Sequence, residues 1–209
     1  MKDIKFYKLL VFVNALVPLM LLGWDWRGGR LGANPLDFLT RTTGTLTLVF
    51  LVITLAVTPL RKLTGWQWLV RLRRMVGLYA FFYGSLHLLT YLWFDKAFDL
   101  RAIADDVARR RFILVGVLAL TSMVPLAVTS TDRMIKRLGG KRWQKLHRLT
   151  YLSAVAGVVH YYLLVKSDTR KPLAFAAVVA LLLAYRAYVS YAKGAAPLSL
   201  KPQPPRAKT

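Results

Sequence analysis

The three histidines of this 209-residue chain are the side chains best suited to chemistry. His147 and His160 lie thirteen residues apart in "WQKLHRLTYLSAVAGVVHYYLLV", and His87 lies in a second apolar segment. A neutral imidazole can ligate a metal ion or carry a proton. An ionisable side chain inside an apolar segment indicates a functional site by default. The helices that carry these histidines must therefore be placed first.

The composition predicts an all-α integral membrane protein. Hydrophobic residues make up 56% of the chain, mean hydropathy is +0.42 and the formal net charge is +22. Each of six apolar runs approaches the roughly 20 residues that a bilayer crossing requires. We expect a six-transmembrane-helix bundle in one domain, residues 1–192, and a disordered basic tail, residues 193–209. The expected spans are residues 7–24, 42–59, 75–94, 112–129, 149–165 and 172–191.

Charge outside the spans predicts the orientation. The N-terminus through Lys8, the loops 60–74 and 130–148 and the tail hold 19 Lys and Arg, whereas the three alternate loops hold 11 together with seven of the nine Asp. The positive-inside rule therefore places both termini in the cytoplasm. The charges bracket apolar runs, which argues against nucleic acid as a partner. The absence of Cys excludes disulfides, iron–sulfur clusters and covalently attached haem.

In this orientation His87 and His160 share the outer half of the membrane on two different helices. Two imidazoles facing each other at one depth can supply both axial ligands of a haem iron. Gly84 and Gly157 each precede a histidine by three residues, on the same helix face, and we expect them to make room for the macrocycle. Each histidine alone has two ordinary interpretations, a hydrogen-bonded structural residue or part of a proton path.

The inner end has one histidine, His147, the candidate iron ligand of a second haem. "RLRRMVGLYAFFYGSLH" matches "KLHRLTYLSAVAGVVH" as a weak repeat in which Arg73 stands in the position of His147. At about 100° per residue Arg73 lies within about 40° of the helix face of His87, whereas Arg74 lies about 140° away. A guanidinium offers no lone pair. We therefore expect Arg73 to contact a haem propionate.

These segments resemble the MsrQ (YedZ) family, the membrane haem subunits of bacterial methionine sulfoxide reductase systems, within the ferric-reductase-like transmembrane group. The resemblance rests on "RRMVGLYAFFYGSLHLLTYLWFD", "WQKLHRLTYL" and "VVHYYLLVKSD". It implies a bacterial inner-membrane protein that holds b-type haem, with His87, His147 and His160 at the matching positions. It also implies electron transfer from the quinone pool, with FMN, to MsrP, a periplasmic molybdopterin enzyme that carries out the sulfoxide chemistry.

The chain departs from the related NADPH oxidases, which carry four histidines in two pairs. The haem count, one or two, and the position of FMN therefore stay open. The alternatives are a ferric reductase or cytochrome b with a small acceptor, a proton or metal transporter, and a structural membrane anchor. Since no Asp lies inside the spans, a transporter is disfavoured. We expect the outer loop 95–111 to dock the periplasmic partner, with Asp99, Asp105 and Asp106 facing water.

Overall fold

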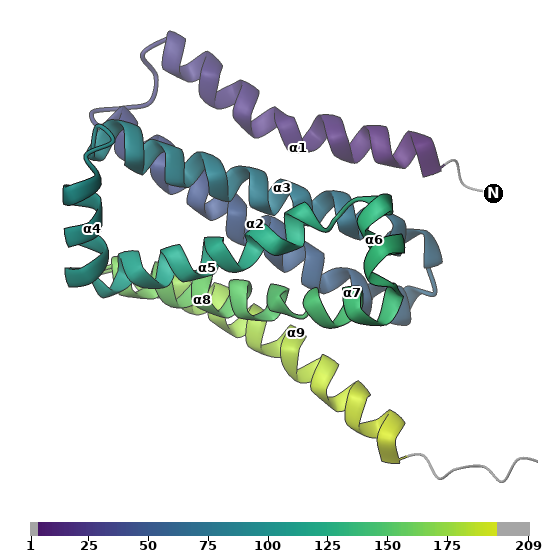
Figure 1. The fold of residues 1–209 in the computed structure, drawn as a ribbon. Coiled ribbons are helices and arrows are strands. Elements are labelled where there is room, and N and C mark those ends of the chain that lie inside the picture. The colour runs from purple at the N-terminus through teal and green to yellow at the C-terminus, as the bar shows by residue number, and fades with distance from the viewer. Residues whose placement is uncertain (1–3, 196–209) are drawn as a thin grey trace, which may run out of the picture.

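The computed structural model describes residues 4–195, and all regular structure in that part of the chain is helical. Figure 1 shows long helices that run side by side, with short helices at both ends of the bundle. In chain order they are α1 (Ile4–Arg27), α2 (Pro35–Thr64), the 3-10 helix η1 (Gln67–Leu69), α3 (Val70–Thr90), the π-helix η2 (Tyr91–Asp95), α4 (Leu100–Arg109), α5 (Arg111–Val128), α6 (Asp132–Leu138), α7 (Gly140–Leu146), α8 (Leu149–Leu164) and α9 (Arg170–Ala195).

The predicted all-α membrane class is confirmed. Five segments are long and apolar enough to cross a membrane: α1, α2, α3 together with its flanking η1 and η2, α5 and α9. The helix α8 coincides with the predicted fifth span but has only 16 residues. These helix lengths therefore support five spans and leave the sixth, and the side on which the termini lie, as predictions. Residues 196–209 of the predicted tail lie outside the described residues.

The helices extend further than the predicted spans. Asn34 accepts a hydrogen bond from the backbone N–H of Asp37 and caps α2, while Gly65, at φ 74°, ends it in the left-handed conformation that glycine adopts readily. Most of the predicted loop 60–74 is consequently helical, and Arg73 and Arg74 belong to α3. The predicted loop 130–148 likewise contains two short helices, α6 and α7.

Two helix pairs form the centre of the bundle. The helix α2 packs mainly against α3, and α5 mainly against α8, while α9 contacts α8 and α2. The N-terminal end of α1 and the C-terminal end of α9 lie at the end of the molecule where α6 and α7 lie. The helix α4 lies at the opposite end (Figure 1). We call these the inner and outer ends. The more basic segments of the sequence lie at the inner end, and the segments with most of the Asp lie at the outer end.

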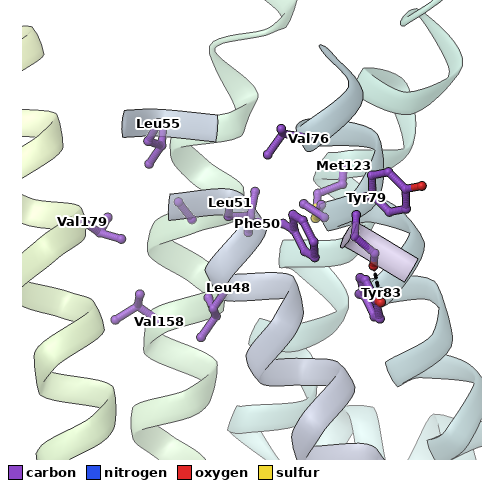
Figure 2. Packing of buried hydrophobic residues seen from close by; sticks show 13 residues of the cluster. Leu48, Phe50, Leu51, Leu55, Val76, Tyr79, Tyr83, Met123, Val158 and Val179 are labelled. Atoms are coloured by element: carbon purple, nitrogen blue, oxygen red, sulfur yellow. Dashed lines mark hydrogen bonds between the residues drawn. The ribbon is translucent and has the colours of Figure 1, made fainter. Parts of the chain in front are cut away.

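Buried side chains from several helices join the pairs, as Figure 2 shows. Tyr83 of α3 is fully buried, stacks on Phe50 of α2 and donates a hydrogen bond of 2.6 Å to the carbonyl oxygen of Ala15 in α1. The hydroxyls of Ser122 in α5 and Ser153 in α8 lie 2.6 Å apart. Because lipid is as apolar as leucine, close packing and such buried hydrogen bonds are what hold membrane helices together.

Candidate haem-ligand site

His87, near the outer end of α3, is held by the first third of α2. Its Nδ1 lies 2.9 Å from the carbonyl oxygen of Thr40. A carbonyl oxygen can only accept, so Nδ1 carries the proton and Nε2 keeps its lone pair. Gly44 lies one helical turn further along α2, and a Cβ there would come within 3.0 Å of the imidazole. The ring therefore rests against bare backbone.

His160 of α8 repeats this arrangement against α5. Its Nδ1 lies 2.6 Å from the carbonyl oxygen of Phe112, and a Cβ on Gly116 would come within 2.7 Å of the ring. In each pair, a carbonyl and a glycine four residues later hold the imidazole of the partner helix. The two pairs thus form a structural repeat. A fixed Nδ1–H bond of this kind orients an imidazole for ligation through Nε2 and makes it more basic.

The repeat brings the two imidazoles together. The ring centres of His87 and His160 lie 6.0 Å apart, and their planes make an angle of 78°. A bond from an imidazole nitrogen to a first-row metal ion is about 2.0–2.1 Å, as zinc sites show, which places two rings on opposite sides of one ion with centres roughly 6 Å apart. The donor set and its spacing therefore fit two axial ligands of one iron atom. The described residues contain no group of three or more His, Cys, Asp or Glu that could hold a bare metal ion.

A separate apolar groove opens between α3 and α5. It has a volume of about 410 Å³, and its lining includes Phe81, Ser85, Leu88, Leu92 and Leu120. At about 100° per residue, its α3 positions lie roughly 100–200° around the helix from His87, so the groove opens on a different face of α3.

Gly84 and Gly157 lie against neighbouring helices. A Cβ on Gly84 would come within 2.9 Å of the Leu120 side chain, and one on Gly157 within 2.9 Å of Leu48. These contacts show the helix packing that small residues ordinarily permit in membrane bundles. The room beside the imidazoles is provided by other glycines on the partner helices, and the expected role of Gly84 and Gly157 toward a macrocycle stays a prediction.

At the inner end, His147 follows α7 directly. Its ring stacks on Trp143 with centres 3.8 Å apart, and its Nδ1 lies 3.1 Å from the Trp143 carbonyl oxygen. The hydroxyl of Ser130, which donates to Leu126, is 3.5 Å from Nε2. Burial and then the positive charge of Arg73 hold the pKa of His147 below its usual value. Its neutral form, the one that ligates metals, is therefore favoured.

Arg73 and Arg74 point in different directions, as the helix-face argument predicts. The Arg73 guanidinium is close enough to interact electrostatically with His147 and with Arg186 of α9. Arg74 forms an ion pair with Asp132 of α6, a largely exposed residue. The structure thus places Arg73 within electrostatic range of the inner histidine, while the ion pair of Arg74 joins α3 to the surface helix α6.

The outer loop differs from its prediction at one residue. Asp106 does not face water: it is 7% exposed and forms ion pairs with Lys96 at 2.6 Å and Arg110 at 3.2 Å, while the hydroxyl of Tyr91 donates to it at 3.0 Å. Lys96, more than the other neighbours, holds the pKa of Asp106 below its usual range. An amphipathic pattern alone could not show that this carboxylate faces the bundle and fastens α4 to it. Asp105 is exposed and pairs with Arg109.

Sequence reasoning missed three residues of these sites. Gly44 and Gly116 follow Thr40 and Phe112 by four residues, a spacing that recurs in both pairs but is weak without knowing which helices touch. Arg186 had a clearer signal. It lies in the interior of the predicted span 172–191, where an ionisable residue indicates function by default.

A helical membrane bundle with two facing imidazoles fits the class of haem-binding membrane proteins. Comparison with known proteins agrees with this class. Residues 43–158 match the family described as ferric reductase like transmembrane component. The protein-methionine-sulfoxide reductase heme-binding subunit MsrQ of Herminiimonas arsenicoxydans is 50% identical over 188 residues, which cover 89% of this chain and 86% of the relative. The MsrQ proteins of Rhodospirillum rubrum and Ralstonia nicotianae are 54% and 50% identical, over 86% and 90% of this chain and 86% and 87% of their own lengths. The chain belongs to the MsrQ family.

Proposed function

We propose that this protein is a haem b electron-transfer subunit of the bacterial inner membrane. It passes electrons from the quinone pool, with FMN as a further cofactor, to a periplasmic MsrP-like molybdopterin enzyme that reduces methionine sulfoxide in oxidised proteins. The observation that carries the proposal is the repeated geometry at His87 and His160, whose ring centres lie 6.0 Å apart. The names of the relatives, heme-binding subunits of a methionine sulfoxide reductase, support it.

The proposal includes a sixth span, α8, and cytoplasmic termini. The 16 residues of α8 extend roughly 24 Å at 1.5 Å per residue, somewhat less than the hydrocarbon core. The helix is packed against α5 and α9, so neighbouring helices shield its short ends. With α8 as a span, all six cross in alternation, and the more basic loops lie at the inner end. The positive-inside rule makes that end cytoplasmic.

The residues of the outer site would each have a distinct task. When bound, haem supplies a one-electron couple whose potential the protein tunes through ligands, hydrogen bonds and burial. His87 and His160 would hold its iron through Nε2, while their Nδ1 protons stay on the carbonyl oxygens of Thr40 and Phe112. Gly44 and Gly116 let the rings approach the backbone.

The inner site would receive the electrons. His147 is the candidate ligand for a second haem, because its Nδ1 is bonded to the Trp143 carbonyl, which leaves Nε2 as the ligating nitrogen. The Leu126 carbonyl oxygen and the Ser130 hydroxyl also lie near the ring. Arg73 interacts with it electrostatically and has the charge to pair with a propionate or another anionic cofactor group. A second imidazole does not face His147, since the other two histidines form the outer pair.

The outer surface around α4 is our candidate docking site for the periplasmic partner. Asp106 is buried in an ion pair with Lys96. Asp105 is therefore the carboxylate of this helix that is exposed to a partner protein, although it also pairs with Arg109. Reversing that charge, Asp105→Lys, should slow partner reduction most at low ionic strength, because such charges act mainly on association. An unchanged rate of partner reduction at low ionic strength would instead assign the docking site to the loop between α1 and α2.

An absorption difference spectrum tests the proposal. The purified protein, reduced with dithionite, should show b-type haem bands against the oxidised sample, and a pyridine haemochrome assay gives the haem count. A colourless preparation from haem-replete cells contradicts the electron-transfer function.

The family match favours one second candidate, a ferric reductase with a small acceptor. Reduced protein should be oxidised by the sulfoxide-reducing partner much faster than by a ferric chelate. The reverse order of rates would select the ferric reductase.

A further inference from the structure

Arg186 lies in the interior of α9 and clamps three helices together. It donates to the hydroxyl of Tyr151 in α8 at 2.8 Å and to the carbonyl oxygen of Leu55 in α2 at 2.8 Å. That carbonyl lacks its normal helical partner, because Pro59, four residues later, has no N–H. Arg186 also donates to Thr58 at 3.2 Å. The guanidinium is thus fixed in position, and its Nε–H is buried without a protein partner.

The positive charge at this place is not balanced by a carboxylate. The guanidinium of Arg73 lies close enough to that of Arg186 for the two to repel each other. Over residues 4–195, neither arginine takes part in an ion pair with an acidic side chain. Charges inside a membrane protein are costly unless they are paired. Two repelling cations in the same part of the bundle therefore call for an anion.

A groove of about 280 Å³ gives an anion access to Arg186. It lies between α2, α8 and α9, and it is lined among others by Thr58, Lys62, Tyr151, Tyr185 and Ser190. The ammonium of Lys62 lies 5.9 Å from the centre of the Tyr185 ring. Lys62 belongs to the last turn of α2, toward the inner end. The groove combines two cationic side chains with four hydroxyl groups. This is the chemistry that binds the oxygens of a phosphate group.

We propose that this groove is a phosphate-binding site for a phosphate ester at the inner membrane surface. Arg186 supplies a fixed guanidinium and Lys62 a second positive charge, while Tyr185 and Ser190 are hydroxyl donors for the remaining oxygens. The ligand is either the headgroup of an anionic lipid or a soluble phosphate ester. The inference does not depend on haem binding, because none of these residues touches the imidazole pair.

Binding measurements on the full-length protein separate the two sources. In one arm, native mass spectrometry counts phosphatidylglycerol retained by the detergent-solubilised protein, with phosphatidylcholine as reference. In the other, equilibrium binding of FMN and its competition by inorganic phosphate are measured. Lys62→Gln removes a charge from an exposed side chain and leaves the Arg186 clamp intact. Lys141→Gln removes an equal charge from an exposed position in α7 and serves as its control.

We expect Lys62→Gln to weaken at least one of the two probes about fivefold, the effect of roughly one juxtamembrane basic residue, while Lys141→Gln does not. Arg186→Gln should weaken it further, and Arg186→Lys should restore it only in part, since the fork is lost. Loss of lipid retention alone identifies a headgroup, and loss of FMN binding alone identifies a soluble ester. Binding of neither probe, or equal loss in Lys62→Gln and Lys141→Gln, overturns the proposal. An unchanged haem spectrum in Lys62→Gln shows that the outcome is independent of the proposed haem site.

Discussion

The outer and inner ends of the bundle hold their histidines in different ways. At the outer end, His87 and His160 are oriented by backbone carbonyls of neighbouring helices and rest on glycines, with no charged side chain in hydrogen-bond contact. At the inner end, His147 is bonded to its own helix and lies beside Arg73. Backbone groups fix a position without adding charge, whereas the inner arginines add charge that attracts anions.

The difference also explains why one end has a pair and the other does not. The outer imidazoles come from two helix pairs with the same local geometry, so the repeat brings equivalent residues face to face. The inner end breaks the repeat, because Arg73 takes the place of a fourth histidine. Two facing imidazoles therefore occur at the outer end, where we propose the two-ligand site, and not at the inner end. We expect the inner end to hold anionic groups instead.

The largest effect should come from removing either outer imidazole. His87→Ala or His160→Ala should abolish the outer haem band and electron delivery, because one ring cannot replace two axial ligands. His147→Ala, the matched control at the inner end, should leave that band in place. Difference spectra of the three variants provide the measurement. Full and unshifted haem content in both outer variants would contradict the assignment.

The supporting glycines should have the next largest effect. An added Cβ would come within 2.7 Å of the His160 ring at Gly116 and within 3.0 Å of the His87 ring at Gly44. Overpacking of this kind costs about 1–3 kcal/mol, so haem retention should fall roughly 5- to 140-fold, more for Gly116→Ala than for Gly44→Ala. Haem titration of the apoprotein measures this.

Gly77→Ala is the matched control, because a Cβ there meets Thr54 at an ordinary 3.7 Å. If all three alanine variants retain haem equally, the glycines support helix packing only, and the outer pair does not depend on its close backbone contact.

The inner end should respond to Arg73 and not to Arg74. Arg73→Ala should slow electron entry several-fold and leave the outer haem in place, since Arg73 lies beside His147. Arg74→Ala should have little effect, because its ion pair with Asp132 is exposed, and such pairs contribute about 0–1 kcal/mol. Stopped-flow reduction kinetics compare the two. A defect in Arg74→Ala with a normal Arg73→Ala would reverse the assignment of helix faces.

The smallest effect concerns α4, which covers the outer end. Asp106→Asn should increase hydrogen exchange in α4 and leave the haem spectrum unchanged, whereas Asp105→Asn should alter neither. Because Lys96 holds the pKa of Asp106 below its usual range, the stabilisation is complete above the ordinary carboxyl pKa of about 3.9 and is lost as the pH falls through the lowered value. Exchange measured down that pH range should show α4 loosening in the wild type but not in Asp106→Asn. Equal pH profiles would mean that another group fastens the helix.

Much of the architecture followed from sequence patterns that are local. Apolar runs of bilayer length locate helices wherever they lie in the chain, and each of the six predicted spans overlaps a helix of at least 16 residues. The separation of Arg73 from Arg74 also follows from the 100° helical step within a single helix. The resemblance to MsrQ, confirmed by relatives about 50% identical, likewise rests on contiguous residues.

The contacts around the candidate sites depend on residues far apart in the chain. Thr40 and Gly44 meet His87 across 47 and 43 positions, and Arg186 meets Leu55 across 131. A sequence shows which residues share a helix face, but the packing of helices decides which carbonyl an imidazole reaches and which glycine it rests on. The same packing buried Asp106, which the amphipathic pattern of α4 had placed in water. Local periodicity is a property of a single helix, whereas these contacts arise only when two helices pack together.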